Sequence, residues 1–136
     1  MQISANDEAD LAKVHPDLVR VIRRAAKDWP HTNQGFIVTC GLRTLAEQRK
    51  LVAAGASKTL KSRHLAGKTN GLSHAVDLAV TLEGKVRWDW PLYSDLARQI
   101  KAAAANEKVP IEWGGDWRSF KDGPHWQLPW AQYPAQ

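Results

Sequence analysis

The segment from His74 to Thr81 is apolar at most positions, yet an aspartate, Asp77, stands in its middle. Five small or branched apolar residues make this segment typical of a strand buried in a sheet: Ala75, Val76, Leu78, Ala79 and Val80. A lone carboxylate is costly in such a place unless it is paired or bound to a metal. The chain must therefore fold so that other groups compensate Asp77.

Helix and strand patterns are interspersed along the rest of the chain. Apolar residues at helical spacing predict helices over 17–29, 45–54 and 91–105. Short apolar runs predict further strands over 35–40, 86–88, 109–113 and 125–128, with a hairpin turn at 83–85. We expect a loop over 57–73, which is polar, basic and contains glycine. This order predicts an α+β fold with a small, mostly antiparallel sheet and flanking helices.

The totals limit the class of protein. A chain of 136 residues with 43% hydrophobic residues predicts one domain, over 1–136. The only cysteine, Cys40, ends an apolar run, and we expect it to be a small buried core residue. No stretch is long enough for a transmembrane helix, and the acidic start Met1–Glu8 lacks the features of a signal peptide. We expect synthesis in the cytoplasm.

The net charge of +5 favours anionic partners without choosing among them. Basic residues occupy one face of the helix expected over 17–29, and a solvated surface is their ordinary interpretation. The chain has no recognisable motif for reading nucleic acid, so we expect no nucleic-acid partner.

His64, Asp77 and His125 are a candidate ligand set for a metal. Three protein ligands leave one tetrahedral position open for water, which suits a hydrolytic zinc site. A further carboxylate, Asp122, lies three residues before His125. The spacing alone leaves a second interpretation open, in which the histidines are buried and satisfied and Asp77 belongs to an ion pair.

Several motifs, in order, resemble the LAS metallopeptidases. They are Ser-Arg-His at 62–64, His-Ala-Val-Asp at 74–77 and Asp-Gly-Pro-His-Trp at 122–126. The segments 41–48 and 113–117 also resemble the endolysin branch, which holds L-alanyl-D-glutamate endopeptidases. The resemblance spans nearly the whole chain. It implies the fold shared by hedgehog proteins and D-alanyl-D-alanine carboxypeptidases.

The resemblance also implies roles for particular residues. His64, Asp77 and His125 match the zinc ligands, and Asp122 matches the catalytic carboxylate, which is glutamate in many relatives. Arg43 matches the arginine that contacts substrate and stabilises the oxyanion.

Two more residues are expected to contact substrate. Ser62 matches a pocket serine, and Trp117 flanks the last motif where it would line the substrate cleft.

The implied function is that of a zinc-dependent peptidoglycan hydrolase, an endolysin that cleaves the L-alanyl-D-glutamate bond of stem peptides with metal-activated water. Two alternatives stay open: a D-alanyl-D-alanine carboxypeptidase or dipeptidase, and an inactive zinc-containing module that binds peptidoglycan. The expected partners are stem peptides and anionic envelope polymers. We expect a monomer that reaches the cell wall after release, with no separate wall-binding domain.

One departure from the family pattern concerns the first ligand. A polar insert, Lys68–Ser73, separates Gly67 from His74, and a loop can absorb such length at little entropic cost. The alternative ligand His74 lies three residues before Asp77, which would put the two side chains on opposite faces of a shared strand. We therefore expect His64 as the ligand. Glu112 is a second candidate base, although structural pairing is its more ordinary role.

Overall fold

The computed structural model describes residues 1–57, 59, 61–67 and 70–134. Its strands are β1 (Gln34–Cys40), β2 (Ala75–Leu82), β3 (Lys85–Arg87), β4 (Glu112–Trp113) and β5 (His125–Gln127). Its helices are α1 (Ala5–Leu11), α2 (Pro16–Lys27), α3 (Leu45–Ala53), α4 (Trp90–Glu107) and the short 3-10 helix η1 (Gly114–Asp116). Among the described residues, no helix combines the length and apolarity needed to cross a bilayer.

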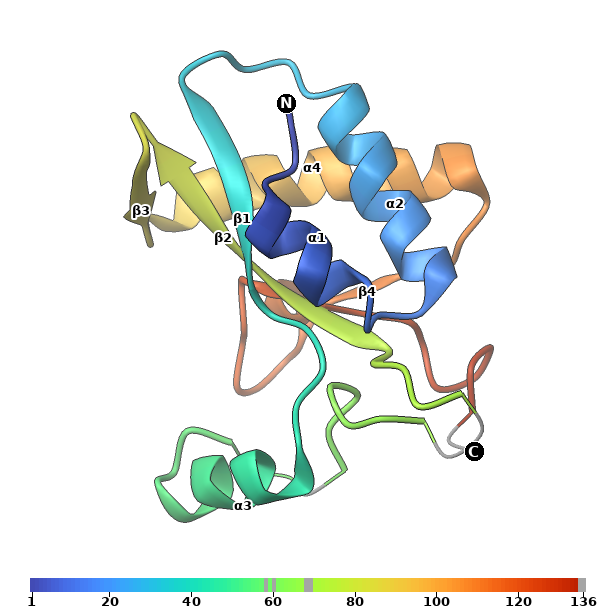
Figure 1. The fold of residues 1–136 in the computed structure, drawn as a ribbon. Coiled ribbons are helices and arrows are strands. Elements are labelled where there is room, and N and C mark those ends of the chain that lie inside the picture. The colour runs from blue at the N-terminus through green and yellow to red at the C-terminus, as the bar shows by residue number, and fades with distance from the viewer. Residues whose placement is uncertain (58, 60, 68–69, 135–136) are drawn as a thin grey trace.

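The sheet is antiparallel, which confirms the expected α+β class. Its strand order is β1-β2-β5-β4, and β3 pairs with β2 as a hairpin. The long strand β2 is the centre of this arrangement (Figure 1). Strand β5 comes last in sequence but lies between β2 and β4, which brings the motif around His125 directly against the strand that carries Asp77.

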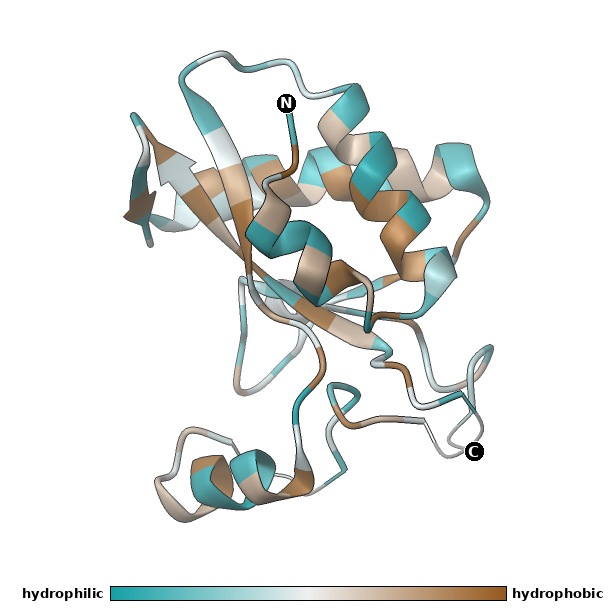
Figure 2. Cartoon of the chain, in the orientation of Figure 1, coloured by the Kyte–Doolittle hydropathy of each residue, from teal (hydrophilic) through white to brown (hydrophobic). Residues whose placement is uncertain are grey.

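Helices α2 and α4 pack against each other and contribute much of the core. Hydrophobic and hydrophilic positions alternate along the ribbon of α2 (Figure 2), as is typical of an amphipathic helix. The residues of α2 that are buried are Leu18, Val21, Ile22, Ala25 and Ala26. Helix α3 stands apart from α2 and α4 (Figure 1), and only Gln48 of its residues is buried.

The elements differ from the sequence-based expectation in a few places. Helix α1 was not expected; Ser4 caps it by accepting a hydrogen bond from the Asp7 amide, and Leu11 is buried. The strand predicted over 109–113 is reduced to Glu112–Trp113. Cys40 is only half-buried, so its placement in the core was wrong. A bulge between Val38 and Cys40 breaks the alternation of the strand.

Candidate metal centre and its cleft

Asp77 lies between two histidines that come from different parts of the chain. Asp77 in β2 and His125 in β5 are direct partners across the two strands, so both side chains stand on the same face of the sheet. His64 approaches from the segment that follows α3. One oxygen of Asp77, Oδ1, lies 3.3 Å from Nε2 of His64 and 3.3 Å from Nδ1 of His125. The strand pairing thus brings the expected ligand set together.

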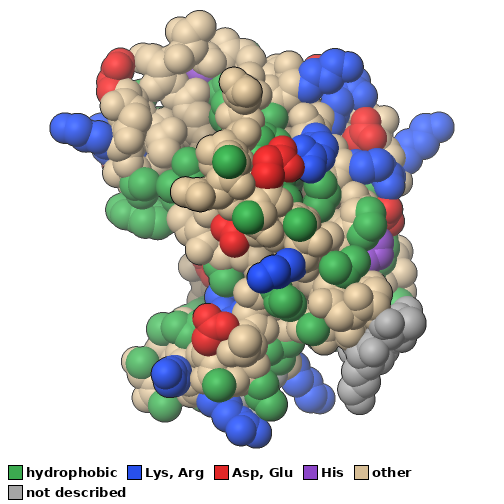
Figure 3. Space-filling model, viewed as in Figure 1, with side chains coloured by type: hydrophobic (Ala, Val, Ile, Leu, Met, Phe, Trp, Pro, Cys, Tyr) green, Lys and Arg blue, Asp and Glu red, His purple; other side chains and the backbone are tan. Residues whose placement is uncertain are grey.

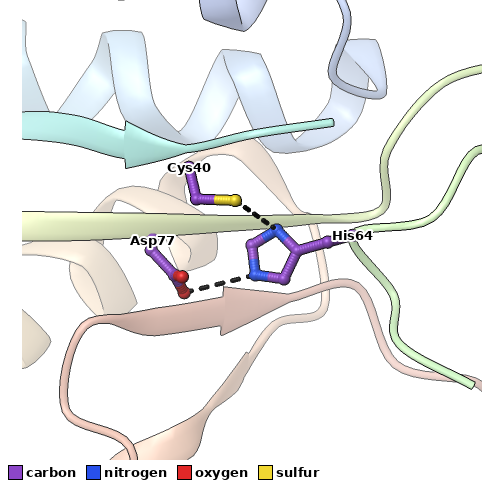
Figure 4. A group of neighbouring side chains, drawn as sticks. All are labelled: Cys40, His64 and Asp77. Atoms are coloured by element: carbon purple, nitrogen blue, oxygen red, sulfur yellow. Dashed lines mark hydrogen bonds and ion pairs between the residues drawn. The ribbon is translucent and has the colours of Figure 1, made fainter. Parts of the chain in front are cut away.

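The other ring nitrogen of His64, Nδ1, already has a hydrogen-bond partner. Nδ1 of His64 lies 2.8 Å from the carbonyl oxygen of Gly41, and because a carbonyl only accepts, Nδ1 carries the proton in the neutral ring. Nε2 is then the nitrogen with the lone pair, and it faces Asp77. The thiol of Cys40 lies on the Nδ1 side, 3.7 Å away, so thiol and carboxylate flank the ring at different nitrogens (Figure 4).

This donor set suits a cation. With His64 neutral, a lone pair on Nε2 faces a carboxylate oxygen, and two acceptors at that distance repel unless a positive charge lies beside them. Two imidazoles and a carboxylate are ligands that zinc and other divalent transition metals bind well. The residues present therefore fit a divalent metal, held by His64, Asp77 and His125.

The charges of the centre are strongly coupled. Burial disfavours the charge of Asp77, but hydrogen bonds to His125 and His64 hold the pKa of its carboxyl well below the usual range. Burial alone would lower the pKa of His64, yet Asp77 and Cys40 raise that pKa to about 9. In the metal-free chain, bound protons thus keep positive charge beside Asp77, where a bound metal would supply it instead.

Asp122 lies beside the same centre. Oxygen and nitrogen atoms of Asp77, Asp122 and His125 come within 4.8 Å of one another. The backbone of Asp122 is fixed at both ends of the residue: its amide donates to the carbonyl of Gly114 at 3.0 Å, and its own carbonyl accepts from the His125 amide at 3.2 Å. Burial, together with the charge of Asp77, raises the pKa of Asp122. A carboxyl with a raised pKa is suited to exchanging protons near neutral pH.

Arg43 lies near the other carboxylate oxygen of Asp77. Its Nη2 atom lies 3.7 Å from Oδ2 of Asp77, and its Nη1 donates to Oε1 of Gln48 at 2.6 Å. Gln48 has no exposed surface, and its Nε2 donates to the Thr59 carbonyl at 2.6 Å and to Ser57 Oγ at 2.9 Å. Gln48 therefore holds Arg43 in place. In the sequence, Gln48 is one of several polar residues of the helix expected over 45–54, and nothing local marks it for this role.

A cleft of about 640 Å³ opens over the centre. It lies between α3 with its following segment and the β2–β5 face of the sheet, and the outline of the molecule is hollowed between α3 and the main body (Figure 3). Ser62 and Trp117 both line it, and the Trp117 ring lies 5.0 Å from the His125 ring. The tryptophans Trp113 and Trp126 are buried in a stack instead and belong to the core.

His74 does not join the centre. It precedes β2, is 8% exposed, and packs its ring 5.2 Å from that of His15. Its amide donates to the carbonyl of Arg63, whose guanidinium is buried and donates to backbone carbonyls of the segment after β5. The beginning of the insert, residues 68 and 69, lies outside the described residues, so no role for the insert is assigned. Glu112 accepts a hydrogen bond from Gln127, in line with structural pairing.

The sequence matches a family model described as phage L-alanyl-D-glutamate peptidase over residues 1–127. The L-alanyl-D-glutamate peptidase of Listeria phage A118 is 34% identical over 119 residues, which cover 86% of this chain and 39% of the relative. That of Escherichia phage T5 is 30% identical over 121 residues, covering 86% of this chain and 82% of the relative. This chain thus spans well under half of the Listeria phage protein and most of the T5 protein.

A solved structure is similar over almost the whole length. The crystal structure of the L-Ala D-Glu endopeptidase ChiX of Serratia marcescens superposes with a TM-score of 0.85 at 44% sequence identity. The match covers 99% of this chain and 95% of the other. The expected fold is therefore confirmed by a relative as well as by the sheet topology.

Proposed function

We propose that this chain, which belongs to the phage L-alanyl-D-glutamate peptidase family, is a zinc-dependent peptidoglycan hydrolase that cleaves the L-alanyl-D-glutamate bond of stem peptides. The observation that carries the proposal is the convergence of His64 and His125 on one oxygen of Asp77, with Asp122 beside them. Such an arrangement suits hydrolysis, and the names of the relatives indicate which bond is cleaved.

In this proposal His64 Nε2, Asp77 and His125 Nδ1 would hold Zn²⁺. When bound there, the metal supplies Lewis-acid chemistry, which makes water a better nucleophile near neutral pH and polarises the scissile carbonyl. The remaining chemistry falls to the chain's own side chains.

Asp122 is the general base and then the general acid. It takes a proton from the water that attacks the L-alanyl carbonyl carbon, and it returns that proton to the amine of D-glutamate as the carbon–nitrogen bond breaks. Its pKa, raised by burial and by Asp77, suits both roles. Arg43, fixed by Gln48, is placed to stabilise the negative charge that develops on the carbonyl oxygen.

Ser62 and Trp117 are proposed to contact the stem peptide, since both line the cleft. Residues 1–136 would act as one catalytic unit and as a monomer, on the cell wall. Contact with anionic envelope polymers rests on the net charge of +5 alone. On helix α2 most of that basic charge is already paired with carboxylates, such as Arg23 with Glu8 and Arg24 with Glu107.

The test is digestion of purified peptidoglycan with the untreated protein, with the chelator-treated protein, and after adding back zinc, followed by mass analysis of the fragments. New L-alanine carboxyl and D-glutamate amino termini, lost with chelator and restored by zinc, are the expected result. Release of terminal D-alanine would instead make the protein a carboxypeptidase. Binding to peptidoglycan with zinc but without any cleavage would make it a binding module and overturn the proposal.

A further inference from the structure

A chain of hydrogen bonds runs from His125 away from the metal centre and ends at a carboxylate. Nε2 of His125 lies 2.7 Å from Oε1 of Gln127, and Nε2 of Gln127 donates to Oε2 of Glu112 at 3.1 Å. Gln127 and Glu112 are direct partners across β5 and β4. His125 and Gln127 are almost fully buried, at 6% exposure each. Three neighbouring positions of the sheet thus form one connected line.

The direction of each hydrogen bond follows from the last member. The carboxylate of Glu112 only accepts, so the amide of Gln127 must turn its NH₂ group toward it. The carbonyl oxygen of that amide then faces His125, and a carbonyl oxygen also only accepts. In the neutral ring, His125 must therefore carry its proton on Nε2. The lone pair of the neutral ring is then left on Nδ1, the nitrogen that faces Asp77.

We propose that Gln127 and Glu112 are positioning residues that fix His125 in the tautomer protonated at Nε2, so that Nδ1 is the atom offered to the metal. This inference rests on the proposed function for the metal itself. It adds that the two histidines present different nitrogens, Nε2 from His64 and Nδ1 from His125. In each ring the other nitrogen is held by a protein oxygen, from Gly41 or from Gln127.

The energetic reason is that an imidazole in solution prefers neither nitrogen strongly and rotates freely. A ring that must change tautomer or turn before binding loses part of its affinity for the metal. Partners of this kind typically contribute about 10- to 100-fold to metal affinity. Because the glutamine amide could be turned either way, Gln127 alone would not select the tautomer, and Glu112 supplies the selection.

The test measures zinc affinity and the tautomer of His125 separately from catalysis. Zinc affinity is obtained by competition with a fluorescent chelator. The protonated nitrogen of His125 is identified by nitrogen NMR of the metal-free protein, at a pH at which the spectrum shows a neutral ring. Gln127→Leu removes the acceptor and is expected to weaken zinc binding about 10- to 100-fold. Glu112→Gln keeps the shape of the side chain and removes the charge at the end of the hydrogen-bond chain. It is expected to populate the other tautomer of His125, with a smaller loss of zinc affinity.

A paired exchange provides the rescue. In the double variant Glu112→Gln/Gln127→Glu, the carboxylate at position 127 accepts from both His125 and the amide at position 112, so the hydrogen bonds are restored with the charge moved. It is expected to bind zinc within about threefold of the original protein and to show the proton on Nε2. Gln34→Leu makes the same chemical change as Gln127→Leu at the other end of the sheet and serves as the control.

The outcomes separate the two proposals. If the original protein binds no zinc, the proposed metal function fails. If it binds zinc but Glu112→Gln leaves both affinity and tautomer unchanged, the positioning role is wrong, whether or not Gln127→Leu folds. A loss in both single variants that the exchange does not restore would likewise show that packing, and not hydrogen-bond direction, was responsible.

Discussion

A Cβ atom on Gly114 would lie 2.3 Å from the carbonyl oxygen of Asp122. The two residues touch through their backbones, since the Asp122 amide also donates to the Gly114 carbonyl. A side chain on Gly114 would in addition come within 3.1 Å of the Cβ of His125. The absence of a side chain at Gly114 therefore lets the loop that carries the proposed base lie against η1.

Gly114→Ala tests this contact. The methyl group cannot be accommodated against backbone atoms without moving the loop, so we expect a loss of stability of about 1–3 kcal/mol. Peptidoglycan hydrolysis should fall at least about tenfold, because small displacements of a catalytic group are costly. Gly35→Ala is the matched control: its Cβ would meet the flexible end of Met1 at 3.2 Å, and little change is expected. Equal activity in both variants would contradict the proposed role of the contact.

Asp122→Asn tests the base while preserving size. An amide cannot take the proton from water, so kcat should fall by about 10²- to 10⁴-fold. Zinc affinity should stay within about threefold, because Asp122 is not one of the proposed ligands. Asp116→Asn, at an exposed position paired with Lys101, should leave both quantities unchanged. A variant that kept most of its kcat would transfer the role to another group.

Gln48→Leu tests how Arg43 is held. Without the Gln48 acceptor the guanidinium is free to leave Asp77, and we expect kcat/KM to fall about tenfold with zinc affinity unchanged. If Gln48 acts through Arg43, adding Gln48→Leu to Arg43→Lys should cause little further loss in a double-mutant cycle. Additive losses would show that Gln48 acts independently, through the segment around Thr59.

The pH dependence of stability should contain a contribution from His74. Burial, with the charges of Arg63 and His15 nearby, lowers the pKa of His74 from 6.5 to about 4. The unfolded chain therefore takes up this proton before the folded chain does. Above pH 6.5 the residue has no effect, and between pH 6.5 and about 4 it destabilises the fold progressively, by at most about 3 kcal/mol.

Denaturant unfolding of the metal-free protein at a series of pH values checks this. Carboxylates also titrate over part of that range, so the quantity to compare is the difference between the original chain and His74→Gln. That difference should change with pH in favour of the variant as the pH falls from 6.5 toward 4. A constant difference would mean that His74 keeps its ordinary pKa in the fold.

The sequence was informative where local pattern determines structure. The apolar segment around Asp77 is the central strand, the helix expected over 45–54 is α3, and a glycine-containing turn joins β2 to β3. Local pattern also marked Asp77 as a buried charge that needs partners, whereas the resemblance to the LAS metallopeptidases pointed to His64, His125 and Asp122 as those partners. The position of β5 between β2 and β4 could not be derived in this way, since strand order depends on contacts between distant segments.

The supporting residues were the ones that sequence reasoning missed. Gln48 and Gln127 are ordinary polar residues in isolation, and their roles depend on which groups the fold places opposite them. Glu112 was considered as a base, yet its carboxylate accepts a hydrogen bond from Gln127, its partner across the two strands. Trp88 and Trp90 are 64% and 46% exposed, while Trp29, the same type of side chain, is buried. Hydrophobicity alone does not say which face of a helix or hairpin the rest of the chain covers.

The interior position of β5 has a consequence for the order in which the proposed metal centre forms. A ribosome delivers α2, β1 and β2 well before β5, and until β5 arrives the edge of β2 that it will occupy has no strand partner. His125 and Asp122 arrive with that same late segment. A nascent chain can thus display His64 and Asp77, but the proposed metal centre is complete only after β5 has been synthesised and has paired with β2.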